Sequence, residues 1–283
     1  PHLAKGRIDL VHELAGPLPV IVIAELIGVP TSDRHMFKHL SDLLVKGARD
    51  DSEEAFQELM DEKAKAHEEL DQYFMNIVNE RRNELKDDLV SLLIEAEIEG
   101  QKLSDLEIVR FCILLLVAGN ETTTNLITNA VRILCQQPEL QQRIAEQPTL
   151  IPTTVEETLR YYPPIVAIGR VASEDVVLQG QTIQAGQQVI SWVGAANRDE
   201  RKFSQSEQFV PDRKPNQHMG FGFGIHFCLG APLARLEGRI VLETLLAKMR
   251  EMKLEAEATL EPIQSAFVFG VREYPIVFET NPS

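Results

Sequence analysis

The chain has 283 residues, of which 44% are hydrophobic and 25% are charged. This length suffices for one large domain or two small ones, and the composition excludes a wholly disordered chain. The formal net charge of -15 disfavours binding to nucleic acid or to anionic membrane surfaces, because both would repel it.

The first part of the chain, about residues 1–162, is predicted to be helical. Residues 17–29 contain two prolines near their start and end near Gly28, which is the usual asymmetry of helix termini. Residues 53–82 carry apolar residues at three- and four-residue spacing among dense charge. That spacing predicts an amphipathic helix with a solvated face.

A third, longer helix should begin after Ser104, which forms a capping box with Glu107. Apart from Gly119, no helix breaker follows until Pro138, so the helix should be about 50 Å long at 1.5 Å per residue. Its central residues are apolar on all sides. We therefore expect it to pass through the middle of the protein.

The second part, about residues 163–283, is predicted to be richer in strands. Short β-rich pieces separated by glycine turns indicate small sheets, and a further helix should follow an irregular polar stretch. The β-rich pieces are 174–180, 181–186 and 187–193, the irregular stretch is 198–220, the helix is about 231–250, and strand-like residues follow at 266–271 and 274–279. Both parts are expected to form one domain, residues 1–283, of the mainly α (α+β) class.

The three cysteines, Cys112, Cys135 and Cys228, are far apart and form no CxxC pair. This spacing is typical of a protein from a reducing compartment. The longest uncharged apolar runs, such as residues 111–119, are too short to span a bilayer, and the first ten residues lack the apolar core of a signal peptide. We therefore expect a soluble, cytoplasmic protein.

The stretch FGFGIHFCLG, residues 221–230, places three glycines around one cysteine directly before a helix. Glycine is costly to order, so such a cluster indicates that something bulky approaches the backbone: a phosphate, a metal or a flat cofactor. The stretch lacks the lysine of a phosphate-binding loop, and His226 and Cys228 lack the second ligand pair of a structural zinc site. A plain structural turn with a buried cysteine is the other interpretation.

Cys228 lies where free backbone N–H groups and the positive end of the helix dipole favour a thiolate, which suits an axial ligand of haem iron. The whole stretch resembles the FxxGx[HR]xCxG signature of the cytochrome P-450 family, the haem-thiolate monooxygenases. The soluble bacterial members also continue, like this chain, as APLARLE. The resemblance implies a P-450 fold and haem b (iron protoporphyrin IX). It also implies that Cys228 is the proximal iron ligand, with further haem contacts from Phe221, Gly222, His226 and Gly230.

The stretch AGNETTT, residues 118–124, places a glycine and three threonines inside the long helix, where propensity disfavours them. The Thr122 hydroxyl can bond back to the Ala118 carbonyl and bend the helix. Close packing of helices through small residues is the alternative. In the family that this chain resembles, Ala118 and Gly119 line the oxygen-binding groove beside the haem, and Glu121 and Thr122 relay protons to dioxygen.

Glu157 and Arg160 are three residues apart on one helix face and can pair. An exposed pair of this kind contributes little to stability. In the family, this ExxR pair is buried and locks the loop that carries the cysteine, together with an arginine that corresponds to Arg213. Arg170 resembles the family's propionate-binding arginine, and residues 164–168 resemble a segment that lines the substrate pocket.

The implied reaction inserts one oxygen atom of dioxygen into a hydrophobic organic substrate. No flavin or iron–sulfur motif is present, so electrons are expected from a separate ferredoxin or flavodoxin with its reductase. Arg235 and Arg239 are candidates for docking an acidic partner, or belong to a solvated helix face. The expected substrate-lining residues are Ala118, Val166, Ala167 and Phe267.

Two alternatives to the monooxygenase remain. A peroxide-using or rearranging haem-thiolate enzyme is disfavoured by the Glu121–Thr122 pair, because such an enzyme needs no proton relay to dioxygen. A truncated haem-binding fragment with little or no activity is the other.

The resemblance begins well inside the family's chain, and roughly the first third of a usual member has no counterpart. We expect unpaired strand edges near Val176 and Val189 and bared apolar surface at residues 114–117. The chain is then either a truncated form or a homo-oligomer in which a second copy covers these surfaces. In both cases haem affinity should be weaker than in a full-length relative, and activity low or absent.

Overall fold

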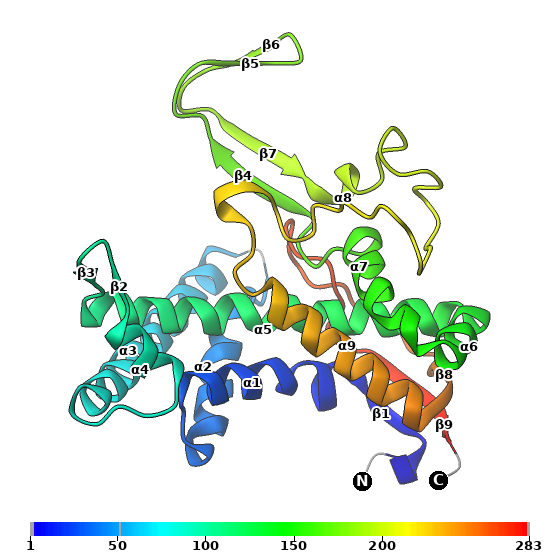
Figure 1. The fold of residues 1–283 in the computed structure, drawn as a ribbon, viewed down its shortest axis with the longest axis horizontal. Coiled ribbons are helices and arrows are strands. Elements are labelled where there is room, and N and C mark those ends of the chain that lie inside the picture. Colours follow the sequence, from blue (N-terminus) through cyan, green and yellow to red (C-terminus); the bar gives the residue numbers. More distant parts are fainter. Residues whose placement is uncertain (1–2, 51, 282–283) are drawn as a thin grey trace. The chain divides into compact units, whose positions relative to one another are not determined.

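The computed structural model describes residues 3–50 and 52–281 (Figure 1). Helices dominate the described residues. The α-helices are α1 (Pro17–Ile27), α2 (Arg34–Val45), α3 (Glu53–Asn83), α4 (Leu89–Glu95), α5 (Asp105–Gln136), α6 (Pro138–Glu146), α7 (Ile151–Tyr161), α8 (Val193–Ala196) and α9 (Ala231–Lys248). The strands are β1 (Arg7–Asp9), β2 (Glu97–Ile98), β3 (Gln101–Lys102), β4 (Ala167–Val171), β5 (Val176–Leu178), β6 (Gln181–Ile183), β7 (Gln188–Trp192), β8 (Met249–Leu254) and β9 (Pro275–Thr280).

Two compact units divide the chain. Unit 1 comprises Pro1–Val11 and Asn125–Ser283, and unit 2 comprises His12–Thr124. None of the helices in the described residues is both long and apolar enough to cross a membrane.

Unit 2 contains α1 to α4 and the first part of α5, and its helix termini follow the sequence patterns. Helix α1 ends at Gly28, whose φ of 90° is left-handed and favours glycine. Ser52 caps α3, because its side chain accepts a hydrogen bond from Ala55 N. The capping box at α5 is confirmed: Glu107 Oε2 accepts the Ser104 N–H at 2.8 Å, and Ser104 Oγ accepts the Glu107 N–H at 3.3 Å.

A buried ion pair joins α1, α3 and α4 within unit 2. Arg81 Nε donates to Asp88 Oδ2 at 2.6 Å, and Arg81 Nη2 donates to the carbonyl of Gly28 at 3.1 Å. Asp88 also caps α4 by accepting the Ser91 N–H at 2.9 Å. Hydrogen bonds from Arg81 and Ser91 outweigh desolvation and keep the pKa of Asp88 below its ordinary value.

The strands of unit 1 form three small sheets, as the sequence predicts for residues 174–193. Strands β1, β9 and β8 make a three-stranded antiparallel sheet, β4 pairs with β7, and β5 pairs with β6. The β5–β6 ribbon lies at the tip of the β4–β7 hairpin (Figure 1). Many of the buried apolar residues of unit 1 come from α7, α9 and the part of α5 after Asn125.

In unit 1, one predicted helix ends two residues earlier than expected, and one predicted strand is wrong. The expected helix at about 231–250 ends at Lys248, and Met249–Leu254 is strand β8, paired with β9. The buried Gln141 side chain bonds both the carbonyl and the N–H of Met252, where the ladder register shifts. The expected strand at 266–271 contributes only isolated bridges, one of them between Ile165 and Val268, because no continuous strand pairs with it.

Of the apolar side chains that the sequence predicts to be exposed, some are exposed and others are buried. Val176 and Val177 of the β5–β6 ribbon are 47% and 67% exposed. On α5 of unit 2, Leu114 is 59% exposed whereas Leu116 is fully buried, so one face of residues 114–117 already packs inside the unit. Association through these surfaces stays a prediction.

A buried carboxyl in α9 predicts a pH-dependent stability. Glu237 is 6% exposed, and its Oε2 has no hydrogen-bond partner among the described residues. Desolvation raises its pKa from 4.5 to about 7. The unfolded chain therefore releases this proton first, so the free energy of unfolding falls by about 1.4 kcal/mol per pH unit between these values, or about 3 kcal/mol in all.

Glu237→Gln should remove this loss. We expect the variant to be more stable than the unsubstituted protein by up to about 3 kcal/mol at pH about 8, with almost no difference at pH about 4.5. Urea unfolding at both pH values measures the effect. Glu243→Gln, an exposed carboxyl in the same helix, is the control. Equal pH slopes for Glu237→Gln and the unsubstituted protein would contradict the prediction.

Candidate functional site

The segment around Cys228 is closed by its own backbone hydrogen bonds. The Cys228 N–H donates to the Phe221 carbonyl at 2.9 Å, and the Phe227 N–H donates to the Gly224 carbonyl at 3.0 Å. The Cys228 carbonyl accepts the N–H of Ala231, the first residue of α9. These bonds form a compact turn that holds the half-buried Cys228 side chain just before the N-terminus of α9.

Two glycines of this segment are required by the backbone. Gly222 and Gly224 both have a φ of 73°, in the left-handed region that side chains other than glycine rarely adopt. Gly230 has an ordinary φ of -77°, and a Cβ there would lie 3.9 Å from the Cys228 sulfur. Its lack of a side chain leaves space beside the sulfur.

Apolar side chains of the segment that carries Cys228 are exposed to solvent. Phe223 is 82% exposed, Ile225 97% and Leu229 71%. A run of exposed apolar residues is unusual for a soluble surface and marks a binding face. A thiol at a helix N-terminus, fringed by apolar side chains, fits a flat apolar macrocycle with a thiolate-binding metal, so the residues present suit haem.

His226 and Arg170 are the two residues that the resemblance assigns to haem propionates. His226 lies in the turn Gly224–His226, and Arg170 lies on β4; both are exposed. Arg170 Nη1 donates to the neighbouring Gly169 carbonyl at 2.8 Å, and none of the ion pairs found among the described residues includes it. Its guanidinium therefore has donors left for an anionic group.

The expected substrate-lining residues of unit 1 lie together. The Val166 N–H donates to the Phe267 carbonyl at 2.9 Å, so residues 165–167 and 267–268 run side by side. Phe267 is 46% exposed, Val166 is half-buried, and Ala167 is buried at the start of β4. This pairing joins two apolar segments that are far apart in the sequence.

In unit 2, the AGNETTT stretch adopts the predicted hydrogen bond. Thr122 Oγ1 donates to the Ala118 carbonyl at 2.7 Å, as a residue four positions later on a helix can. Ala118 is exposed. A Cβ at Gly119 would lie 3.1 Å from Ile23 Cδ1 of α1, so this glycine also has the packing role that the alternative interpretation gives it.

Glu121 is half-buried on α5, and burial changes its acidity. Desolvation raises its pKa above the ordinary value, and the charge of Lys63 offsets this only in part. The carboxyl therefore keeps its proton to higher pH than an exposed glutamate does.

The Glu157–Arg160 pair is buried. Both side chains have 0% exposure, and Arg160 forms two hydrogen bonds of 2.8 Å with the carboxylate. Arg213 Nε donates to the same carboxylate at 3.0 and 3.1 Å. Arg160 also donates to backbone carbonyls of the irregular segment 197–208. The two arginines and Glu157 thus hold a segment that has no regular secondary structure.

The sequence patterns missed a second cluster beside this one. Glu156, next to Glu157 on α7, bonds to His218 and to Arg235. Arg235 is therefore paired within unit 1, and Arg239 Nε lies 3.7 Å from Glu243 Oε1; docking of an acidic partner at these arginines stays a prediction. In the sequence, the only signal of this cluster is His218, which precedes the glycine segment. Glu156 lies 62 residues before His218, so no local pattern connects them.

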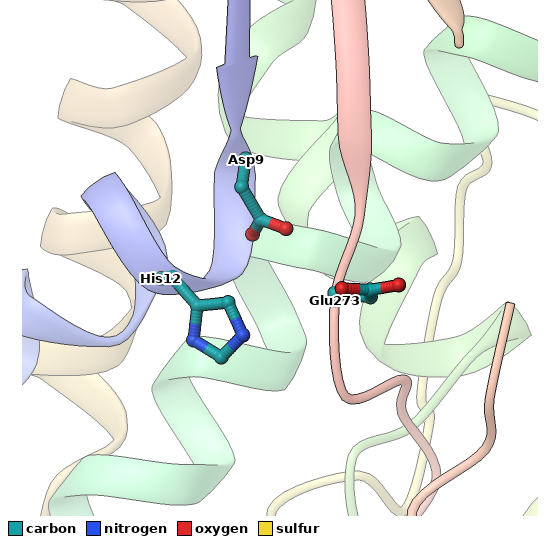
Figure 2. A group of neighbouring side chains, drawn as sticks. All are labelled: Asp9, His12 and Glu273. Carbon is teal, nitrogen blue, oxygen red and sulfur yellow. The ribbon is translucent and has the colours of Figure 1, made fainter. Parts of the chain in front are cut away.

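Figure 2 shows another group of polar side chains, which includes Asp9 and Glu273 from opposite ends of the chain. Asp9 ends β1, and Glu273 precedes β9, the strand that pairs with β1. Asp9 is half-buried and Glu273 is exposed. We assign no functional site to these residues.

Comparisons with known proteins identify the family of the chain. The cytochrome P450 family model matches residues 35–279. Cytochrome P450 109 of Bacillus spizizenii is 50% identical over 273 residues, which cover 96% of this chain and 67% of that protein.

Solved structures extend the likeness to the fold. Substrate-free CYP109E1 of Bacillus megaterium has a TM-score of 0.95 at 45% identity, covering 98% of this chain and 72% of that one. CYP109E1 in complex with testosterone has a TM-score of 0.91. The chain therefore belongs to the cytochrome P450 family, the haem-thiolate monooxygenases, and has the mainly helical fold and the haem cofactor of that family.

Proposed function

We propose that the sulfur of Cys228 is the proximal ligand of haem b in this chain. The observation that carries this proposal is the presentation of Cys228: a half-buried thiol just before a helix N-terminus, fringed by exposed apolar side chains. Such a fringe suits the face of an apolar macrocycle. The further cofactor contacts that we propose are Phe221, Gly222, Gly230, Ala118 and Gly119, with His226 and Arg170 at the propionates.

The chain's own residues supply proton delivery in this proposal. When bound, haem iron with a thiolate ligand activates dioxygen so that one oxygen atom is inserted into an organic substrate. Thr122 donates its hydroxyl proton to Ala118, which leaves its oxygen free to accept a hydrogen bond. Glu121 holds a proton to higher pH because it is desolvated. We propose that Glu121 and Thr122 pass protons to dioxygen.

The substrate is proposed to be a hydrophobic molecule that contacts Ala118, Val166, Ala167 and Phe267. The apolar pairing of Val166 with Phe267 supports this, and the testosterone complex of CYP109E1 shows such a molecule in a similar protein. Electrons are proposed to come from a ferredoxin or flavodoxin with its reductase, in the cytoplasm.

Turnover of a panel of hydrophobic compounds with a surrogate ferredoxin and reductase tests the reaction. Oxygenated product that depends on the redox pair and on dioxygen supports the proposal. Product formed only with added peroxide would instead favour the peroxide-using alternative.

Thr122→Ala should separate electron consumption from product formation. We expect haem and substrate binding to persist, while product per electron pair falls by about tenfold or more and hydrogen peroxide appears instead, because protons no longer arrive in order. Measured product and peroxide, each divided by reductant consumed, give the result.

Thr124→Ala is the matched control for Thr122→Ala. Thr124 Oγ1 also donates to a carbonyl four residues earlier, that of Asn120, at 3.0 Å, but it has no part in the proposed relay. If Thr122→Ala and Thr124→Ala form equal amounts of product per reductant consumed, Thr122 has no part in the mechanism.

A further inference from the structure

Glu156 of α7 contacts both ends of the segment that carries Cys228. Before the segment, His218 Nε2 lies 3.0 Å from Glu156 Oε2. After it, Arg235 of α9 forms two hydrogen bonds with the same carboxylate, Nε to Oε1 at 2.6 Å and Nη2 to Oε2 at 3.0 Å. The Glu156 carboxylate therefore connects His218, which precedes the segment, with helix α9, which follows it.

The entry side is held tightly against α7. The Gly220 N–H donates to His218 Nδ1 at 3.1 Å, while Nε2 of the same ring contacts Glu156. A Cβ at Gly220 would lie 2.9 Å from the Leu159 carbonyl of α7. Gly220 therefore packs closely against α7, where any larger residue would clash, and His218 bonds the same helix through Glu156.

The exit side leads to Cys228 through an unbroken series of contacts. The Arg235 guanidinium carbon lies 4.6 Å from the centroid of the Phe221 ring, a cation–π contact. The Phe221 carbonyl accepts the N–H of Cys228 at 2.9 Å. A shift of the Arg235 side chain would therefore move the residue that fixes the cysteine backbone.

Charge makes the carboxylate the centre of this cluster. Desolvation alone would raise the pKa of Glu156, but hydrogen bonds from His218 and Arg235 outweigh it and lower the pKa to about 2. Glu156 is therefore ionised at neutral pH, and its bonds are charge-assisted. Its neighbour Glu157 holds a different part of the chain, the irregular segment that contains Arg213.

We propose that Glu156 is a positioning residue for Cys228: it ties His218 and Arg235 together and so keeps the sulfur in the place from which it binds haem iron. The second half of this statement rests on the proposed function of Cys228. The first half concerns the segment alone.

Amide hydrogen exchange tests the first half. In Glu156→Gln, peptides covering residues 218–231 should exchange about tenfold or more faster than in the unsubstituted protein, because a charge-assisted clamp is lost. Arg235→Gln should accelerate the same peptides to a similar degree, and the double variant should add little, since both changes remove one contact. If Glu156→Gln fails to fold, exchange in Arg235→Gln by itself decides whether the clamp exists.

Asp88→Asn is the matched control. It removes a carboxylate from another arginine pair, with Arg81 in unit 2, without touching the Cys228 segment. It should lower overall stability and leave exchange at 218–231 unchanged at temperatures where the protein is folded.

The carbon monoxide adduct of the reduced holoprotein tests the second half. In Glu156→Gln and Arg235→Gln, the red-shifted thiolate band should be lost in favour of the thiol form, whereas Asp88→Asn should keep it. If amide exchange at residues 218–231 is unchanged in Glu156→Gln and Arg235→Gln, the proposal is overturned. It is also overturned if exchange is faster in these variants but the thiolate band keeps its full intensity. A missing thiolate band in the unsubstituted protein would instead refute the ligand role of Cys228, while the exchange result still judges the clamp.

Discussion

Cys228→Ser is expected to abolish the thiolate signature of this protein. The reduced, haem-loaded protein should give a strongly red-shifted Soret band under carbon monoxide, and the serine variant should lack it, because an alcohol is a much weaker donor to iron than a thiolate. Monooxygenase turnover should be lost with the band. Absorption spectra of equal amounts of both proteins provide the measurement.

Cys135→Ser is the control for this experiment. Burial raises the pKa of the Cys135 thiol to about 12, although a hydrogen bond with Tyr274 acts the other way. The Cys135 thiol is therefore harder to ionise than an ordinary thiol, which disfavours it as a replacement for Cys228. A red-shifted band that survives in Cys228→Ser would show that the ligand is another residue.

Glu157→Gln should destabilise the fold more than any other single charge removal considered for this chain. Its carboxylate neutralises Arg160, which has 0% side-chain exposure, and Arg213, which has 7%. It also accepts the Val210 N–H at 2.9 Å and the Asn216 amide at 3.1 Å. Leaving two buried guanidinium groups without a counter-charge costs about 3–5 kcal/mol, a large part of the about 5–15 kcal/mol by which domains are stable.

Thermal unfolding followed by circular dichroism measures this loss. A decrease in Tm of roughly 10 °C is expected, together with reduced haem content, because the segment 197–216 loses its anchor. Asp212→Asn is the matched control: it lies beside Arg213, but its pair with Arg143 is half exposed and contributes at most about 1 kcal/mol. A Tm of Glu157→Gln equal to that of Asp212→Asn would contradict the importance assigned to the buried cluster.

The helices could be predicted from the sequence because their signals are local. Three such signals involve residues at most four positions apart. They are the capping box of Ser104 and Glu107, the bond of the left-handed Gly28 to the last turn of α1, and the bond from Thr122 to Ala118. A helix depends on such short separations, so its start, its end and its internal bends are written in adjacent residues. The glycine segment 221–230 is equally local and identifies the family.

Strand limits depend on distant partners and escaped the sequence patterns. The helix expected at about 231–250 ends at Lys248, because pairing with β9 and the buried Gln141 side chain make Met249–Leu254 strand β8. Residues 266–271 look like a strand and form only isolated bridges, since no neighbouring strand continues beside them.

The charged clusters of unit 1 were likewise decided by the tertiary structure. Helix spacing alone makes Glu157 and Arg160 an ordinary surface pair, and only the family resemblance implied burial together with Arg213; the structure shows all three side chains buried. The bonds of Glu156 to His218 and Arg235 span still larger separations. The free energy of an ion pair depends on how far both partners are removed from water, and only the packed chain determines that.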